Sequence, residues 1–110
     1  MRANIVKRAD VSAKDLGGGV SRRVLSHNPQ MMMVEVVFEK GGVGAVHIHP
    51  HVQSTYVLSG AFAFTIDGEP VVVRTGDTIT FESGVAHGTL CLVAGALLDV
   101  FTPQREDFLG

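Results

Sequence analysis

Three of the five histidines in this sequence lie within five residues, at His47, His49 and His51. Alternate residues of a β-strand point to the same face with Cα atoms about 6.6 Å apart, so the imidazoles of His47 and His49 can converge on one ion. An HxH sequence alone is a weak signal of metal binding. The hypothesis of a metal site therefore depends on further ligands.

Two other side chains can complete such a site. Gln53 has the parity of the two histidines, but on a straight strand it would lie about 20 Å from His47, so the chain must turn between them. Pro50 favours a turn there, because proline has no N–H and disfavours helical geometry at the preceding residue. We predict His47 and His49 on one strand, Gln53 at the start of its neighbour, and His87 as a fourth ligand from a distant strand.

A carboxylate in an apolar run is the second candidate group. On a strand, Asp99 shares its face with Leu97 and Phe101, and it is buried if both faces of the sheet are covered. An unpaired buried carboxylate costs several kcal/mol or becomes neutral, so Asp99 needs a partner or a raised pKa. Asp99 is thus a candidate acid–base group. The structural alternative is an aspartate satisfied by backbone groups or by an arginine.

Arg105 is a candidate for binding a substrate carboxylate, because a guanidinium can form two parallel hydrogen bonds with it. The alternative is an ion pair with Glu106 or Asp107 in the C-terminal segment.

Four other features receive structural interpretations. We expect His51 to have a turn or supporting role beside the site, and His27 to be solvated. Cys91, among apolar neighbours, is expected to be a core residue rather than a nucleophile. The run Met31–Met33 could offer soft ligands to copper, but successive strand residues point to opposite faces, so core packing is favoured.

The elements that must position these residues are predicted to be short strands. Thirteen glycines and four prolines separate runs rich in Val, Ile, Thr and Phe, which is typical of an all-β sandwich or barrel. Asp67-Gly68 predicts a tight hairpin turn, with Pro70 at the edge of the returning strand. A helical turn is possible at Asp10–Leu16. The expected strands are Val20–Leu25, Met31–Glu39, Val46–His49, Ser54–Ser59, Ala61–Ile66, Val71–Arg74, Thr78–Phe81, His87–Val93 and Ala96–Thr102.

Size and composition exclude several classes of protein. The 110 residues suit one domain spanning 1–110, and 45% hydrophobic residues exclude intrinsic disorder. The net charge of −2 argues against a nucleic-acid partner, and no apolar run is long enough for a membrane span. The single cysteine excludes an internal disulfide, and the N-terminus lacks the apolar region of a signal peptide. We expect a soluble cytoplasmic protein.

The spacing of these residues resembles the two motifs of the cupin superfamily. In residues 41–60 the spacing is Gly41, five residues, His47-Ile48-His49, three residues, Gln53, six residues and Gly60. In residues 76–91, Gly76, Gly84 and His87 fit, whereas Glu82 replaces the motif proline and Cys91 its asparagine. The resemblance implies a double-stranded β-helix, or jelly-roll barrel. It also implies one divalent transition metal (Zn, Ni, Co, Fe or Mn) bound by His47, His49, Gln53 and His87.

Gln53 departs from the motif, which has glutamate at this position. Because an amide is neutral, the ion would keep its full charge, which favours Lewis-acid chemistry over a purely structural role.

Three segments narrow the resemblance to the pectin-degradation cupins of the KdgF type. They are Gly17–Leu25, the His-Pro-His segment before Gln53, and the closing run Leu98–Leu109. Members of that family linearise 4,5-unsaturated uronate monosaccharides to 5-keto-4-deoxyuronate. The resemblance places their catalytic Asp, Phe and Arg at Asp99, Phe101 and Arg105, the last two also contacting the uronate.

Two other functions stay open at this point, a non-catalytic cupin that binds sugar acids and an iron-dependent dioxygenase. We also expect a homodimer, because open β-edges need cover and the resemblance to small cupins implies a dimer.

Overall fold

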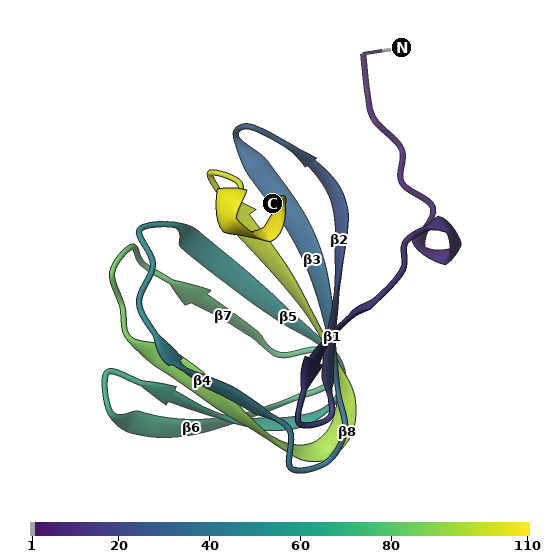
Figure 1. Cartoon of the computed structure of the whole chain (residues 1–110). Coiled ribbons are helices and arrows are strands. Elements are labelled where there is room, and N and C mark those ends of the chain that lie inside the picture. Colours follow the sequence, from purple (N-terminus) through teal and green to yellow (C-terminus); the bar gives the residue numbers. More distant parts are fainter. Residues whose placement is uncertain (1) are drawn as a thin grey trace.

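The computed structural model describes residues 2–110, in which nearly all regular structure is antiparallel β-sheet (Figure 1). The all-β prediction is therefore confirmed. The strands are β1 (Lys14–Gly17), β2 (Val20–Asn28), β3 (Met31–Phe38), β4 (Val43–His47), β5 (Val52–Ile66), β6 (Glu69–Arg74), β7 (Thr78–Phe81) and β8 (His87–Thr102). Two 3₁₀ turns, η1 (Arg8–Asp10) and η2 (Glu106–Phe108), lie near the ends of the chain.

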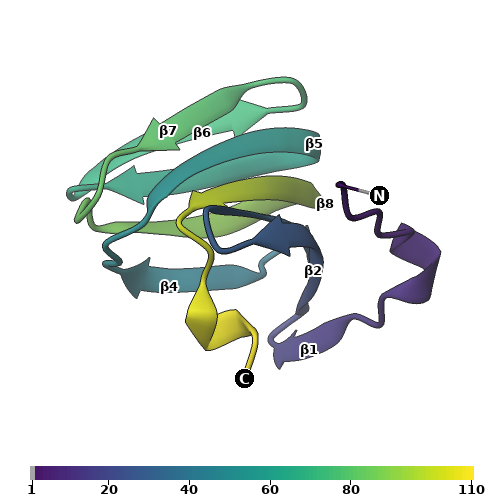
Figure 2. The same ribbon diagram turned by 90° about the horizontal axis from the view of Figure 1, so that it is seen from above.

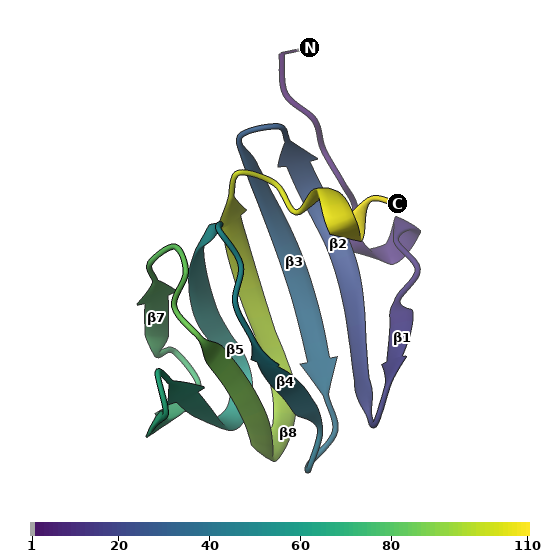
Figure 3. The same cartoon turned by 60° about the vertical axis from the view of Figure 1, so that its left-hand side comes forward.

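Two long bent strands, β5 and β8, belong to both layers of the fold. The first half of β5 pairs with β7 and with the end of β8, and its second half pairs with β6 and with the start of β8. The start of β8 also pairs with β4, and its end pairs with β3. One layer thus has the order β1-β2-β3-β8-β5-β7 and the other β4-β8-β5-β6, and the two curve around a common interior (Figures 2 and 3).

Glycines allow both long strands to bend at the same place. Gly60 in β5 has φ +87°, and a Cβ there would overlap the carbonyl oxygen of Val93. A Cβ on Gly95 in β8 would overlap the carbonyl oxygen of Ser59. The two backbones therefore cross too closely for any side chain, and glycine is required at both positions.

Several predicted boundaries were wrong. The strands expected on either side of residues 60 and 94–95 are continuous, because the glycines bend β5 and β8 without ending them. β4 spans Val43–His47 instead of Val46–His49, and β2 continues to Asn28. The helical turn expected at Asp10–Leu16 is also absent, since Lys14–Gly17 pairs with β2.

Other expectations agree with the structure. The Asp67-Gly68 turn joins β5 to β6, where both residues have positive φ, and Pro70 lies in β6 at the end of the strand order. Met32 is fully buried whereas Met31 is exposed, so the methionine run does alternate between faces.

The interior contains two apolar clusters that leave room for a pocket between them. The larger cluster lies between the layers and includes Phe38, Phe62, Phe64 and Phe81. The smaller one contains Met32, Val34 and Phe101 and is packed against Phe108 of η2. Among residues 2–110, no helix has the length and apolar character needed to cross a membrane.

Candidate active site

Three histidines predicted as ligands come together at one end of the interior. His47 ends β4 and is the cross-strand partner of His87 at the start of β8, and His49 follows in the segment that leaves β4. One ring nitrogen from each lies within 4.8 Å of the others. His49 and His87 are buried, whereas His47 is exposed. His49 was predicted to lie on the same strand as His47. This was wrong, because β4 ends at His47 and His49 lies in the segment after it.

Backbone carbonyls fix which nitrogen each imidazole presents. The Nδ1 atoms of the three rings lie 2.8–3.1 Å from the carbonyl oxygens of Ala45, His51 and Val85. Because a carbonyl only accepts, each Nδ1 carries the proton and each Nε2 presents its lone pair, as in metal-binding histidines. Burial also lowers the pKa of His49 and His87, which favours the neutral form of both rings. The buried Nε2 of His87 has no hydrogen-bond partner within residues 2–110.

Gln53 adds an oxygen to this group. It is 5% exposed near the start of β5, and its Oε1 lies 2.9 Å from Nε2 of His49. With the amide in this orientation and a neutral ring, two lone pairs face each other, and a metal ion bound by both atoms would account for the short distance. Adjacent ligands about 2.1 Å from one ion, at right angles to each other, would be similarly spaced. Three imidazoles and an amide oxygen therefore fit a divalent transition ion.

The position of Gln53 in the sheet differs from the prediction. β5 is the next strand after β4 along the chain, but it pairs with β6, β7 and β8. Gln53 pairs with Phe101 near the end of β8 and with Phe81 of β7, so its side chain reaches the histidines from the other layer.

Asp99 lies in the same pocket and bonds to a hydroxyl group. Its cross-strand partner on β5 is Thr55, whose Oγ1 donates to Asp99 Oδ1 over 2.7 Å. Oγ1 of Thr55 also accepts a 2.9 Å hydrogen bond from Nε2 of Gln53. Burial raises the pKa of Asp99 to about 6, although the bond from Thr55 opposes this rise. Asp99 thus has both the partner and the raised pKa that its place in an apolar strand requires.

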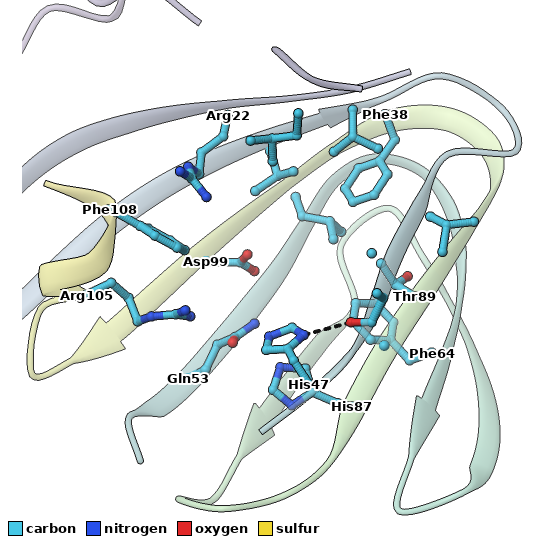
Figure 4. Close-up of a pocket in the computed structure, with 18 of the residues that line it drawn as sticks. Arg22, Phe38, His47, Gln53, Phe64, His87, Thr89, Asp99, Arg105 and Phe108 are labelled. Carbon is cyan, nitrogen blue, oxygen red and sulfur yellow. Dashed lines mark hydrogen bonds between the residues drawn. The ribbon is translucent and has the colours of Figure 1, made fainter. Parts of the chain in front are cut away.

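A pocket of about 270 Å³ connects these groups (Figure 4). This volume is just below the ~300–1,000 Å³ typical of small-molecule sites and suits one monosaccharide-sized ligand. Its apolar wall includes Phe38, Phe64 and Leu97. Its polar lining includes His47, Gln53, His87, Asp99 and Arg105, so the structure brings most of the predicted site residues to one cavity.

Arg105 forms the C-terminal ion pair that was the alternative interpretation, and it also lines the pocket. Its Nε and Nη2 donate to the carboxylate of Asp107 over 3.0 and 2.8 Å. The guanidinium also lies 5.1 Å from the ring centroid of Phe101 and lines the pocket. The ion pair therefore holds the arginine in place without removing it from the cavity.

Arg22 is a pocket residue that the sequence analysis did not single out. It extends from β2, with its guanidinium 3.9 Å from the ring centroid of Phe108, and Arg105 lies 4.3 Å from the same centroid (Figure 4). Within residues 2–110 it has neither a hydrogen-bond acceptor nor an ion-pair partner. Its parity with Val20 and Val24, whose side chains face inward, is the signal that could have identified it.

Comparison with known proteins gives the family. Residues 34–100 match the model of the Cupin domain family. The chain is 39% identical over 98 residues to the pectin degradation protein KdgF of Dickeya dadantii, covering 87% of this chain and 89% of that protein. This chain is a KdgF-family cupin.

Two solved structures agree with this assignment. KdgF from a Halomonas species superposes with a TM-score of 0.91 at 30% identity, covering 96% of this chain and 98% of that one. An RmlC-like cupin from Shewanella frigidimarina gives the same score at 38% identity, with 96% of each chain covered. The predicted cupin fold and its KdgF type are both confirmed.

Three other residues of this KdgF-family cupin lie outside the histidine cluster. His51 donates from Nε2 to the carbonyl of Gln104 over 3.2 Å, consistent with a supporting role. His27 was expected to be solvated, but it is half-buried, and its Nδ1 lies 2.8 Å from the Gln104 side chain because β2 extends to bring it there. Cys91 is 1% exposed in the larger apolar cluster, and burial raises the pKa of its thiol.

Proposed function

We propose that this protein opens the ring of 4,5-unsaturated uronate monosaccharides and yields 5-keto-4-deoxyuronate. The observation that carries this proposal is a carboxyl group of raised pKa, Asp99, in the same small pocket as two arginines and two histidines of the three-histidine cluster. The pocket size suits a monosaccharide, and the Dickeya relative is a pectin degradation protein.

Asp99 is proposed to move the proton. Its carboxylate would take the proton of the anomeric hydroxyl while the bond from C1 to the ring oxygen breaks, which leaves an aldehyde at C1 and an enolate at C5. The same carboxyl would then return the proton to C4, and the enolate becomes a ketone. The reaction is an isomerisation that needs no oxidant. A pKa of about 6 lets Asp99 both accept and return a proton near neutral pH.

The arginines and Phe101 are proposed to hold the substrate. Arg105, fixed by Asp107, would bind the uronate carboxylate, and Phe101 would pack against the sugar ring. Arg22, which has free donors at the same pocket, would bind a further substrate oxygen.

The ligands of the proposed metal are His47, His49, Gln53 and His87. A divalent ion (Zn, Ni, Co, Fe or Mn) bound there would supply Lewis-acid polarisation of a substrate oxygen. The four neutral side chains do not offset its charge, and the nearby Asp99 hydrogen-bonds to Thr55 instead.

The experiment uses unsaturated monosaccharides produced by a polysaccharide lyase, whose conjugated double bond absorbs ultraviolet light. Metal-loaded protein should remove this absorbance faster than buffer, and Asp99→Asn should lower the rate about 10²- to 10⁴-fold while metal content is kept. Asp10→Asn, an exposed substitution outside the pocket, is the matched control.

Three outcomes would contradict the proposal. They are no turnover, full activity of Asp99→Asn, and substrate-dependent oxygen consumption by the iron-loaded protein. The last would identify a dioxygenase, and uronate binding without turnover a sugar-acid-binding cupin.

We also propose that residues 1–110 act as one cytoplasmic domain that forms a homodimer. The edge strand β6 exposes Val71 and Val72, by 40% and 44%, and an apolar edge of this kind favours cover by a second copy. Light scattering on the purified protein tests this, and a monomer mass would refute the dimer.

A further inference from the structure

Thr55 connects the proposed metal centre to the proposed acid–base group. It is 1% exposed, and its hydroxyl has two hydrogen bonds, one from Gln53 Nε2 and one to Asp99 Oδ1. The fold accounts for both bonds. Gln53 and Thr55 lie two residues apart on the same face of β5, and Thr55 is the cross-strand partner of Asp99 on β8.

The single proton of this hydroxyl determines the direction of the network. A carboxylate only accepts hydrogen bonds, so the Thr55 proton is directed to Asp99. Toward Gln53, the Thr55 oxygen can then act only as an acceptor. Only the NH₂ end of the Gln53 amide can meet it, and the amide oxygen consequently points to Nε2 of His49, 2.9 Å away.

The opposite orientation of the amide would close the metal site. If Gln53 were turned over, its NH₂ group would donate to Nε2 of His49 and occupy the lone pair meant for an ion. Its oxygen would also face the Thr55 oxygen with no proton between them. Amide orientation thus decides whether the cluster offers four ligand atoms or has one of its nitrogens blocked.

We propose that Thr55 is a positioning residue that fixes the Gln53 amide with its oxygen toward the metal centre. The inference rests on the metal site of the proposed function. It adds a residue that does not itself contact the ion or the reacting atoms.

The test is Co²⁺ binding to the full chain after chelation of any bound metal, measured by calorimetry and by the visible spectrum of the bound ion. Thr55→Val removes the hydroxyl at nearly constant volume and should weaken Co²⁺ binding about 10- to 100-fold, as is typical when a group that orients a ligand is lost. The spectrum should change as well, because the ligand set changes. Thr55→Ser should restore both properties.

Two comparisons make the test specific. Ser54→Ala removes the neighbouring hydroxyl, which is exposed and bonds to Thr80, and should leave Co²⁺ affinity unchanged. In a Gln53→Ala background, Thr55→Val should cause no further loss, because an effect exerted through Gln53 disappears with it. If Thr55→Val does not fold by circular dichroism, Thr55→Ala takes its place.

The inference is overturned if Thr55→Val binds Co²⁺ as tightly as the unmodified chain, or if its loss is the same without Gln53. Absence of Co²⁺ binding by the unmodified chain would overturn it together with the metal site. If the Co²⁺ affinities are as expected but the protein does not turn over the uronate, the inference on Thr55 stands and the proposed activity is refuted. The failure of the inference can therefore be distinguished from the failure of the proposed function.

Discussion

The interaction partner of each charged side chain determines which groups in the pocket are available for proton transfer and for ligand binding. Asp99 bonds to the Thr55 hydroxyl, and Arg105 is paired with Asp107, on the exposed side of the C-terminal turn. A direct ion pair between Asp99 and an arginine would hold the carboxyl ionised well below neutral pH. Because the acidic and basic groups of the pocket are kept apart, Asp99 keeps its raised pKa and the arginines keep donors for an anionic ligand.

Replacing Arg22 should weaken substrate binding more than it slows turnover. Its guanidinium lines the pocket without a partner in residues 2–110, so its donors are available to a ligand. A hydrogen bond from a charged group contributes about 1.5–3 kcal/mol, so Arg22→Gln should raise KM roughly 10- to 100-fold with little change in kcat. Steady-state kinetics with the unsaturated uronate measures both constants.

Arg74→Gln provides the matched control for Arg22, since Arg74 is an exposed arginine of β6 outside the pocket. It should leave KM unchanged. A fall in kcat at constant KM for Arg22→Gln would instead assign Arg22 to the reaction step.

At the level of elements, the shared bend of β5 and β8 is the most demanding feature of the fold. Gly95→Ala should destabilise the protein by about 3 kcal/mol, because its Cβ would overlap the Ser59 carbonyl oxygen and backbone atoms cannot move aside cheaply. Gly68→Ala should cost only about 1–2 kcal/mol, because that position has positive φ but open space around it. Urea denaturation compares the two, and equal losses would contradict this account of the bend.

The sequence predicted the type of each strand better than its limits. Val, Ile, Thr and Phe runs identified the strands correctly, but glycine at residues 60 and 95 suggested turns where the structure has bends, since local composition does not distinguish the two. Likewise, β1 forms because it pairs with β2, and no pattern within Lys14–Gly17 indicates this.

For the site, strand parity singled out Asp99, and the HxH spacing together with the cupin motifs predicted the histidines that cluster in the structure. Thr55 and Arg22 were missed because their roles depend on the β5–β8 register and on the face of β2, which only tertiary structure fixes.

The N-terminal segment is attached to β3 by a pH-dependent contact. Arg8 of η1 donates to both carboxylate oxygens of Glu35 over 2.9 Å, and this hydrogen bond is the main cause that lowers the Glu35 pKa below its ordinary 4.5. The stability it contributes is therefore fully present above pH 4.5 and is lost as the pH falls through the lowered value. Arg8→Gln should reduce Tm at pH 7 and have less effect as the pH approaches 3.

A double substitution tests this assignment. In a Glu35→Gln background, Arg8→Gln should no longer alter Tm at either pH. Lys7→Gln, at the exposed neighbouring residue, should have no effect in any background. A Tm loss from Arg8→Gln that is the same at pH 7 and pH 3 would show that the contact is not ionic.

At the level of the whole molecule, a metal ion bound by the proposed ligands would cross-link strands that are otherwise held together only by sheet pairing and packing. His47 comes from β4, Gln53 from β5 and His87 from β8, so an ion bound to all three connects strands on both sides of the interior. Binding to the folded chain alone stabilises it by about 2.7 kcal/mol when free metal is 100 times Kd, which corresponds to roughly 10 °C in Tm for a domain of this size. Chelation should therefore lower Tm by about this amount and abolish activity, and added Ni²⁺ or Zn²⁺ should restore both.

Variants show whether this shift comes from the cluster. His87→Ala should remove the dependence of Tm on added metal, because the buried and unpartnered Nε2 of His87 is one of the proposed ligand atoms. His27→Ala removes a histidine that contacts Gln104 and does not line the pocket, and it should keep the full shift. If the Tm of His87→Ala still depends on added metal, the ion binds elsewhere. If chelation leaves the Tm unchanged in a protein shown to contain metal, the ion does not link the strands. We expect neither of these two results. An ion held by β4, β5 and β8 together must be released when the packing of these strands is lost, so its binding and the Tm are coupled.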